Sequence, residues 1–140
     1  MLPGQGFPNY FSHVLCEHTF VTAQGSLRHQ FQHALERGSV LDAISAGKAM
    51  GRLSLGDALA LCILMAERDR IRYRRAAPRW VSRFLEEAPK VSLEEAQLVA
   101  AALAALPTIP RLALPVLREL VRERQLVTVQ SVFEDFVVVD

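Results

Sequence analysis

The sequence predicts an all-α protein of about six short helices paired in antiparallel hairpins. Apolar residues recur every three or four positions from about residue 26 to residue 126, as one face of a helix requires. Serine followed three positions later by an acidic residue opens three of these segments, and glycine or proline ends them. A compact bundle and a short stack of hairpins both fit this pattern.

The composition is that of one ordinary globular domain. Hydrophobic residues make up 51% of the 140 residues and charged residues 22%, so the chain can bury a sizeable core without disulfides or metals. The formal net charge of +1 gives no overall attraction to nucleic acid or to a membrane surface. Cys16 and Cys62 lie far apart, and Cys62 sits in an apolar run, so we expect no disulfide.

The apolar segments are too short to cross a membrane. Residues 58–66 and 98–106, the longest nearly apolar stretches, have nine residues each, about half of the roughly 20 that a spanning helix needs. The first ten residues lack the basic and apolar regions of a secretory signal. We therefore expect a cytoplasmic protein with no membrane partner.

The chain is predicted to divide into three parts. Residues 1–25 contain prolines and glycines without helical periodicity, which indicates an irregular arm that also carries histidines. Residues 26–126 hold the helical domain. In residues 127–140 the spacing of Ser131 and Glu134 favours a short helix, whereas the valines favour a strand, so both readings stay open.

The first two helices are bounded by glycines. One helix is predicted from about Ser26, with Leu27 and Phe31 on its apolar face, until Gly38 supplies the stop. The next begins at the cap Ser39 and ends at Gly51.

The third and fifth helices are predicted to form the buried centre. Ser54 with Asp57 caps the run ALALCILMA, and Ser92 with Glu95 caps the run LVAAALAAL. Both runs are apolar on every side, which is typical of a helix surrounded by others. The two capped segments repeat at an offset of 38 residues, which suggests a short tetratricopeptide-like or HEAT-like stack, but a six-helix bundle would give much the same pattern.

Prolines mark the fourth and sixth helices. The fourth is capped by Asp69 and should end before Pro89, with a kink or a break at Pro78 because proline removes one backbone donor. The sixth follows the turn from Pro107 to Pro110 and is expected to have Pro115 in its first turn.

Seven arginines between Glu67 and Arg83 give this stretch a local charge of +5, seven minus the two acids Glu67 and Asp69. At about 100° per residue, five of them are predicted to form one stripe: Arg68, Arg72, Arg75, Arg79 and Arg83. Three interpretations stay open: a face that is solvated or paired internally, as Arg83 with Glu87 would be, a surface for an acidic protein, and a surface for nucleic-acid phosphates.

A second cluster carries metal-ligand chemistry. The spacing of His13, Cys16, His29 and His33 resembles that of the two-Cys, two-His zinc finger, with His13 in place of the first cysteine. His29 and His33 are one helical turn apart, which suits two ligands of one zinc ion. Solvent-exposed histidines unrelated to a metal explain the same spacing.

Catalytic signatures are missing, so we expect no enzyme. Gly47 and Lys48 resemble part of a phosphate-binding loop, but Asp42 stands where that motif needs glycine and Ala49 where it needs serine or threonine. Nucleophile-elbow, dinucleotide-binding and zinc-protease motifs do not occur.

Residues 27–123 resemble a group of small helical proteins of GC-rich bacteria that are rich in alanine, leucine and arginine and have no assigned activity. The resemblance rests on SLGDALALC from Ser54, RYRRAAPRWVSRF from Arg72 and SLEEAQL from Ser92. It implies an all-helical fold and no chemistry. The leading hypothesis is a non-catalytic module that binds a protein partner or itself; a nucleic-acid-binding protein and a zinc-binding N-terminal segment are the alternatives.

Overall fold

A computed structural model of the protein describes residues 25–125. Within these residues it contains six helices and no strand, which confirms the all-α prediction. The helices are 25–37, α2 (Val40–Met50), α3 (Leu55–Arg68), α4 (Arg70–Glu87), α5 (Leu93–Ala105) and α6 (Pro110–Glu123). The predicted arm and the predicted tail after residue 126 lie outside the described residues, apart from Gly25.

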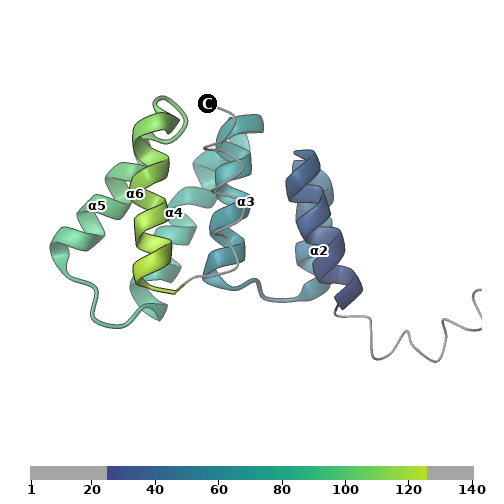
Figure 1. Ribbon diagram of the computed structural model, residues 1–140, viewed down its shortest axis with the longest axis horizontal. Coiled ribbons are helices and arrows are strands. Elements are labelled where there is room, and N and C mark those ends of the chain that lie inside the picture. Colours follow the sequence, from purple (N-terminus) through teal and green to yellow (C-terminus); the bar gives the residue numbers. More distant parts are fainter. Residues whose placement is uncertain (1–24, 126–140) are drawn as a thin grey trace, which may run out of the picture.

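The helices lie in a row in chain order. Figure 1 shows α2 at one end, α5 and α6 at the other, and α3 and α4 between them. Among the labelled helices, the closest packing is between consecutive ones, α2 with α3, α3 with α4, α4 with α5 and α5 with α6. The hairpin formed by α5 and α6 is therefore the end of the row.

Three serines start helices as predicted. The side-chain oxygens of Ser39, Ser54 and Ser92 accept hydrogen bonds from the backbone N–H groups three residues later, at 3.3, 3.1 and 3.0 Å. Each bond satisfies one of the donors that the first turn of a helix leaves without a partner. Such a cap stabilises a helix by about 1 kcal/mol.

Gly38 and Asp69 set the two tightest turns. Gly38 adopts φ = 77°, a left-handed conformation that suits glycine, and a Cβ there would come within 2.8 Å of the Arg68 guanidinium. Asp69 alone separates α3 from α4, and its carboxylate accepts the backbone N–H of Arg72 at 3.2 Å. Because Asp69 has non-helical dihedrals, Arg68 belongs to α3.

The core is built around α3 and the inner face of α4. Ten of the fourteen residues of α3 are buried, which confirms its central position. The Trp80 ring is 2% exposed, stacks on Phe84 with centroids 5.2 Å apart, and donates its N–H to the Leu55 carbonyl at 2.9 Å. Phe31 brings the first helix into the same core. These aromatic side chains join residues that are far apart in the sequence.

The prediction that α5 is buried on every side is wrong. Val99, Ala102 and Leu103 are its only buried residues, and Leu98 is 55% exposed. The cause is its position at the end of the row, where α4 and α6 cover one side of it. Its alanines suit an exposed face because alanine has the highest helix propensity.

The prolines behave differently from expectation. The helix α4 runs from Arg70 to Glu87 without a break, so of the kink or break predicted at Pro78 the break does not occur. A proline inside a helix costs about 3 kcal/mol, which the burial of Tyr73, Trp80 and Phe84 on the same helix offsets. In α6 the first turn begins with Pro110, and Pro115 lies in the second turn rather than in the first.

Candidate interaction surfaces

The five predicted arginines do not form one stripe on one helix. Arg68 ends α3, and its guanidinium lies against Gly38. Arg72 pairs with Asp69 at 2.5 Å, and Arg83 donates to Glu87 at 2.8 Å and to the Leu53 carbonyl at 2.9 Å. Arg75 and Arg79 are exposed and form no ion pair with any residue of the described part.

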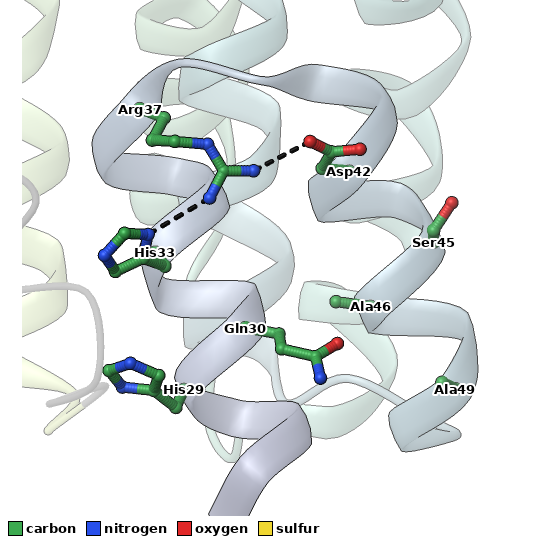
Figure 2. Close-up of a pocket in the computed structure, with 8 residues that line it drawn as sticks. All are labelled: His29, Gln30, His33, Arg37, Asp42, Ser45, Ala46 and Ala49. Atoms are coloured by element: carbon green, nitrogen blue, oxygen red, sulfur yellow. Dashed lines mark hydrogen bonds and ion pairs between the residues drawn. The ribbon is translucent and has the colours of Figure 1, made fainter. Parts of the chain in front are cut away.

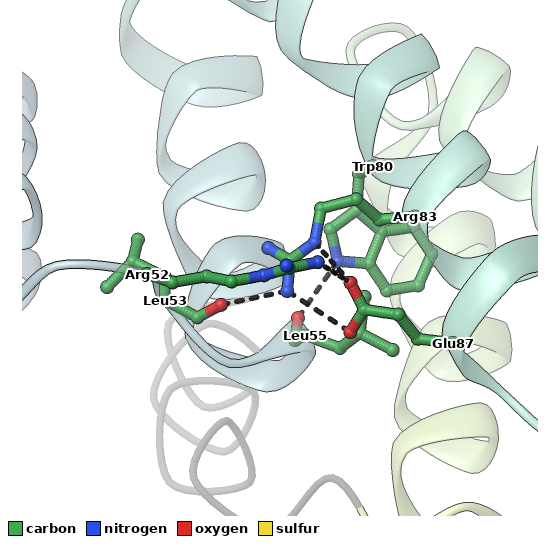
Figure 3. A network of polar contacts seen from close by, with 6 residues as sticks. All are labelled: Arg52, Leu53, Leu55, Trp80, Arg83 and Glu87. Atoms are coloured by element: carbon green, nitrogen blue, oxygen red, sulfur yellow. Dashed lines mark hydrogen bonds and ion pairs between the residues drawn. The ribbon is translucent and has the colours of Figure 1, made fainter.

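Arg83 is the centre of a polar network that ties the loop before α3 to α4. Figure 3 shows the Glu87 carboxylate facing the guanidinium groups of both Arg83 and Arg52, while the Leu53 carbonyl accepts a hydrogen bond from Arg83. The Trp80 indole lies beside the same loop, where it bonds to Leu55. Because the Arg83 side chain is only 25% exposed and is bonded on two sides, its role in this network is structural.

A second network joins α6 to the start of α5. The Arg124 guanidinium pairs with Glu95, donates to the Pro89 carbonyl, and lies 5.6 Å from the centre of the Phe84 ring. The Arg124 hydrogen bond is the main cause that lowers the pKa of Glu95. In the same way, Arg83 lowers the pKa of Glu87 and Arg72 lowers that of Asp69. All three carboxylates are therefore held in the charged form.

These lowered pKa values predict a weaker fold in acid. A carboxylate whose pKa is lower in the folded chain stabilises the fold above its unfolded pKa, here near 4.5 for glutamate, and this contribution disappears as the pH falls through the folded pKa. We expect the urea midpoint to fall between about pH 6 and pH 3, and to fall less in a Glu87→Gln, Glu95→Gln variant. Equal losses in the two proteins would show that these pairs do not contribute.

A groove of about 730 Å³ lies between α5 and α6. Its floor is apolar, with Leu98 and Val116 partly exposed, while four glutamates and one arginine border it. Glu95 is paired with Arg124 and Glu119 with Arg122, whereas Glu94 and Glu123 pair with no residue of the described part. The lining residues are Glu94, Glu95, Leu98, Val99, Pro115, Val116, Leu117, Glu119, Leu120, Glu123 and Arg124.

The sequence interpretation missed this groove. It assigned Glu95 to the cap at Ser92 and placed Leu98 in a helix buried on every side. The available signal was the position of Glu94 four residues before Leu98, which puts both on one helical face. This spacing indicates a groove only once α6 is known to place Val116 and Glu123 beside that face of α5.

A polar groove of about 400 Å³ lies between the first helix and α2. Figure 2 shows Arg37 between His33 and Asp42, with His29 one turn away. The Arg37 guanidinium lies 3.0 Å from the Nδ1 of His33 and 2.7 Å from the Asp42 carboxylate, and the two histidine rings are 5.4 Å apart. The ion pair between Arg37 and Asp42, which is exposed to solvent, therefore links the first helix to α2.

Of the four predicted zinc ligands, the structure describes two. His29 and His33 are neighbours on an exposed helix face, whereas His13 and Cys16 lie outside the described residues. Within residues 25–125, no three His, Cys, Asp or Glu side chains stand close enough together to hold a metal ion. Zinc binding by the four predicted residues stays a prediction.

The buried reactive groups are structural in character. Burial raises the pKa of the Cys62 thiol to about 12, so the nucleophilic thiolate is not populated at neutral pH. Burial also raises the pKa of Tyr73, whose hydroxyl donates to the Leu103 carbonyl at 2.5 Å. Each side chain is packed in the core, and neither lines the α5–α6 groove or the groove between the first helix and α2.

Comparison with known proteins adds no assignment. No protein-family model, no curated protein and no solved structure matches this chain. The resemblance to helical proteins of GC-rich bacteria stays a prediction. No helix in the described part has both the length and the apolar character that a membrane crossing demands.

Proposed function

We propose that this protein is a non-catalytic helical module, located in the cytoplasm, that binds another protein chain through the groove between α5 and α6. The observation that carries this proposal is an apolar floor left exposed at the end of the row of hairpins. Leu98 is 55% exposed inside the groove, where Val116 of α6 is half-buried beside it. Covering these side chains would stabilise a complex by about 25 cal/mol for each Å² of apolar surface removed from water.

The borders of the groove favour a partner of particular character. Four glutamates against one arginine give the lining a formal charge of −3. A partner segment with apolar side chains at its centre and basic side chains around them fits both features. The buried positions of Cys62 and Tyr73 support a role in binding rather than in catalysis.

Nucleic acid is the weaker alternative. Of the five predicted arginines, Arg72 and Arg83 are paired with carboxylates, which leaves Arg75 and Arg79 as exposed members of the set on α4. A phosphate-binding surface normally gains its affinity from many such contacts. Arg75 and Arg79, with the exposed Arg74 beside them on α4, supply a correspondingly small part of that affinity.

Co-purification from the cells that make the protein tests the proposal. We expect tagged wild-type protein to bring down a protein chain, and Leu98→Glu to lose it, because the added carboxylate is buried on binding in an acidic groove. Leu41→Glu is the matched control, since Leu41 is 61% exposed on α2 at the other end of the row. Recovery of nucleic acid alone, lost in an Arg75→Ala, Arg79→Ala variant, would overturn the proposal in favour of the alternative.

A further inference from the structure

We propose that the chain in the groove is a second copy of this protein, which inserts the outer face of its α4. This inference rests on the proposed function and names the partner of the same groove. Two complementary surfaces on one chain carry it. The groove is one of them, and the exposed side of α4 is the other.

The outer face of α4, here called the α4 ridge, consists of Ile71, Arg74, Arg75, Pro78, Arg79 and Leu85. At about 100° per residue these positions share the side of the helix opposite Tyr73, Trp80 and Phe84, which face the core. All six are exposed, Ile71 by 73% and Leu85 by 48%. The ridge therefore combines arginines with apolar side chains that cover nothing within the described part.

The charges of the ridge and the groove are opposite and similar in size. Arg74, Arg75 and Arg79 form no ion pair within the described part, and neither does Glu86, which is exposed on the same side of α4, so the outer side of α4 carries +2, three arginines minus one glutamate. Counted in the same way, the groove carries −2 from Glu94 and Glu123, because Glu95 and Glu119 are paired with Arg124 and Arg122. Opposite charges attract strongly only within about 8 Å at physiological salt, so the two surfaces must come into contact to benefit.

The two surfaces do not meet within one chain. The ridge faces away from the core, and none of its arginines pairs with Glu94, Glu119 or Glu123. The apolar residues match in the same way, since Ile71 and Leu85 are exposed on the ridge and Leu98 is exposed in the groove. Contact between the ridge of one copy and the groove of the next satisfies both surfaces, in a head-to-tail arrangement.

Analytical ultracentrifugation of the full chain tests this inference. We expect the wild-type mass to rise above 15.6 kDa as concentration increases, and to rise less in high salt. Leu98→Glu blocks the groove, and Arg75→Glu, Arg79→Glu blocks the ridge, so each variant alone should stay monomeric. Their equimolar mixture should form a dimer, because each variant supplies the surface that the other lacks. Circular dichroism checks that these exposed substitutions leave the helices intact, and Leu41→Glu should behave as wild type.

Two results would overturn self-association. One is a wild-type mass that stays at 15.6 kDa over the whole concentration range. The other is a mixture of the blocked variants that stays monomeric although the wild type associates, because association then uses a different surface. If self-association fails while co-purification recovers a foreign protein that Leu98→Glu loses, the proposed function stands and only the identity of the partner is wrong.

Discussion

Replacing Trp80 by alanine is expected to lower the free energy of unfolding by about 3–5 kcal/mol, the range for removing a large aromatic side chain from a core. The ring is 2% exposed, stacks on Phe84, and bonds to the Leu55 carbonyl. Its removal leaves a cavity between α3 and α4 and breaks the indole hydrogen bond to the Leu55 carbonyl. Since small domains are stable by only about 5–15 kcal/mol, this single change removes a large part of the total.

Urea unfolding followed by circular dichroism measures this effect. Trp80→Phe keeps most of the ring volume but loses the indole N–H, so it should cost less than the alanine variant. Ser82→Ala, an exposed position on the same helix, should change stability by under about 0.5 kcal/mol. A Trp80→Ala loss as small as that of Ser82→Ala would contradict the central place of Trp80.

Removing Arg28 is expected to have the second largest effect. Asp57 is the one buried charged residue of the described part, at 2% exposure, and it pairs with Arg28 of the first helix. Loss of one partner of a buried pair costs about 3–5 kcal/mol because the remaining charge is left unpaired. Arg28 is 42% exposed, so we expect Arg28→Met to cost about 2–3 kcal/mol.

A double-mutant cycle distinguishes the pair from general damage. Arg28→Met combined with Asp57→Ala should be more stable than Arg28→Met alone, because no unpaired carboxylate stays buried. Asp57→Ala alone leaves Arg28 in contact with water and should cost less than Arg28→Met. Simple addition of the two single effects would show that the pair does not attach the first helix to α3.

Helix ends were predictable because their signals are local. Ser39, Ser54, Ser92 and Asp69 each bond to a backbone N–H three residues away, and a sequence displays that spacing directly. The end of the first helix was equally local, since Gly38 adopts the left-handed φ of 77° at the predicted stop. Features set within about four residues were therefore accessible without a structure.

Features that depend on distant neighbours were not accessible. The run LVAAALAAL has the composition of a central helix, but α5 lies at the end of the row, and only tertiary packing decides that. The pairing of Arg28 with Asp57 and of Arg124 with Glu95 joins residues 29 positions apart in each case. No periodicity or spacing rule connects residues at such separations.

The candidate surfaces also combine features that the sequence displays locally with features that depend on the tertiary fold. The excess of arginine around α4 was visible in the sequence, and Arg75 and Arg79 are exposed there as predicted. Asp69 pairs with Arg72, and the fold places Glu87 against Arg83. The stripe therefore has fewer unpaired arginines than the sequence spacing implied. The groove needed α5 and α6 to be placed together before its charge and apolar floor were apparent.

Photo-crosslinking from inside the groove tests the central claim most directly. A photoreactive amino acid at position 98, placed in the full chain within the cells that make it, lies on the apolar floor. The same amino acid at position 41 on α2 serves as the control, because Leu41 is similarly exposed. We predict a protein adduct from position 98, a second copy of this chain, and none from position 41. Absence of any protein adduct at position 98, or equal adducts at both positions, would contradict the assignment of the α5–α6 groove as the binding surface.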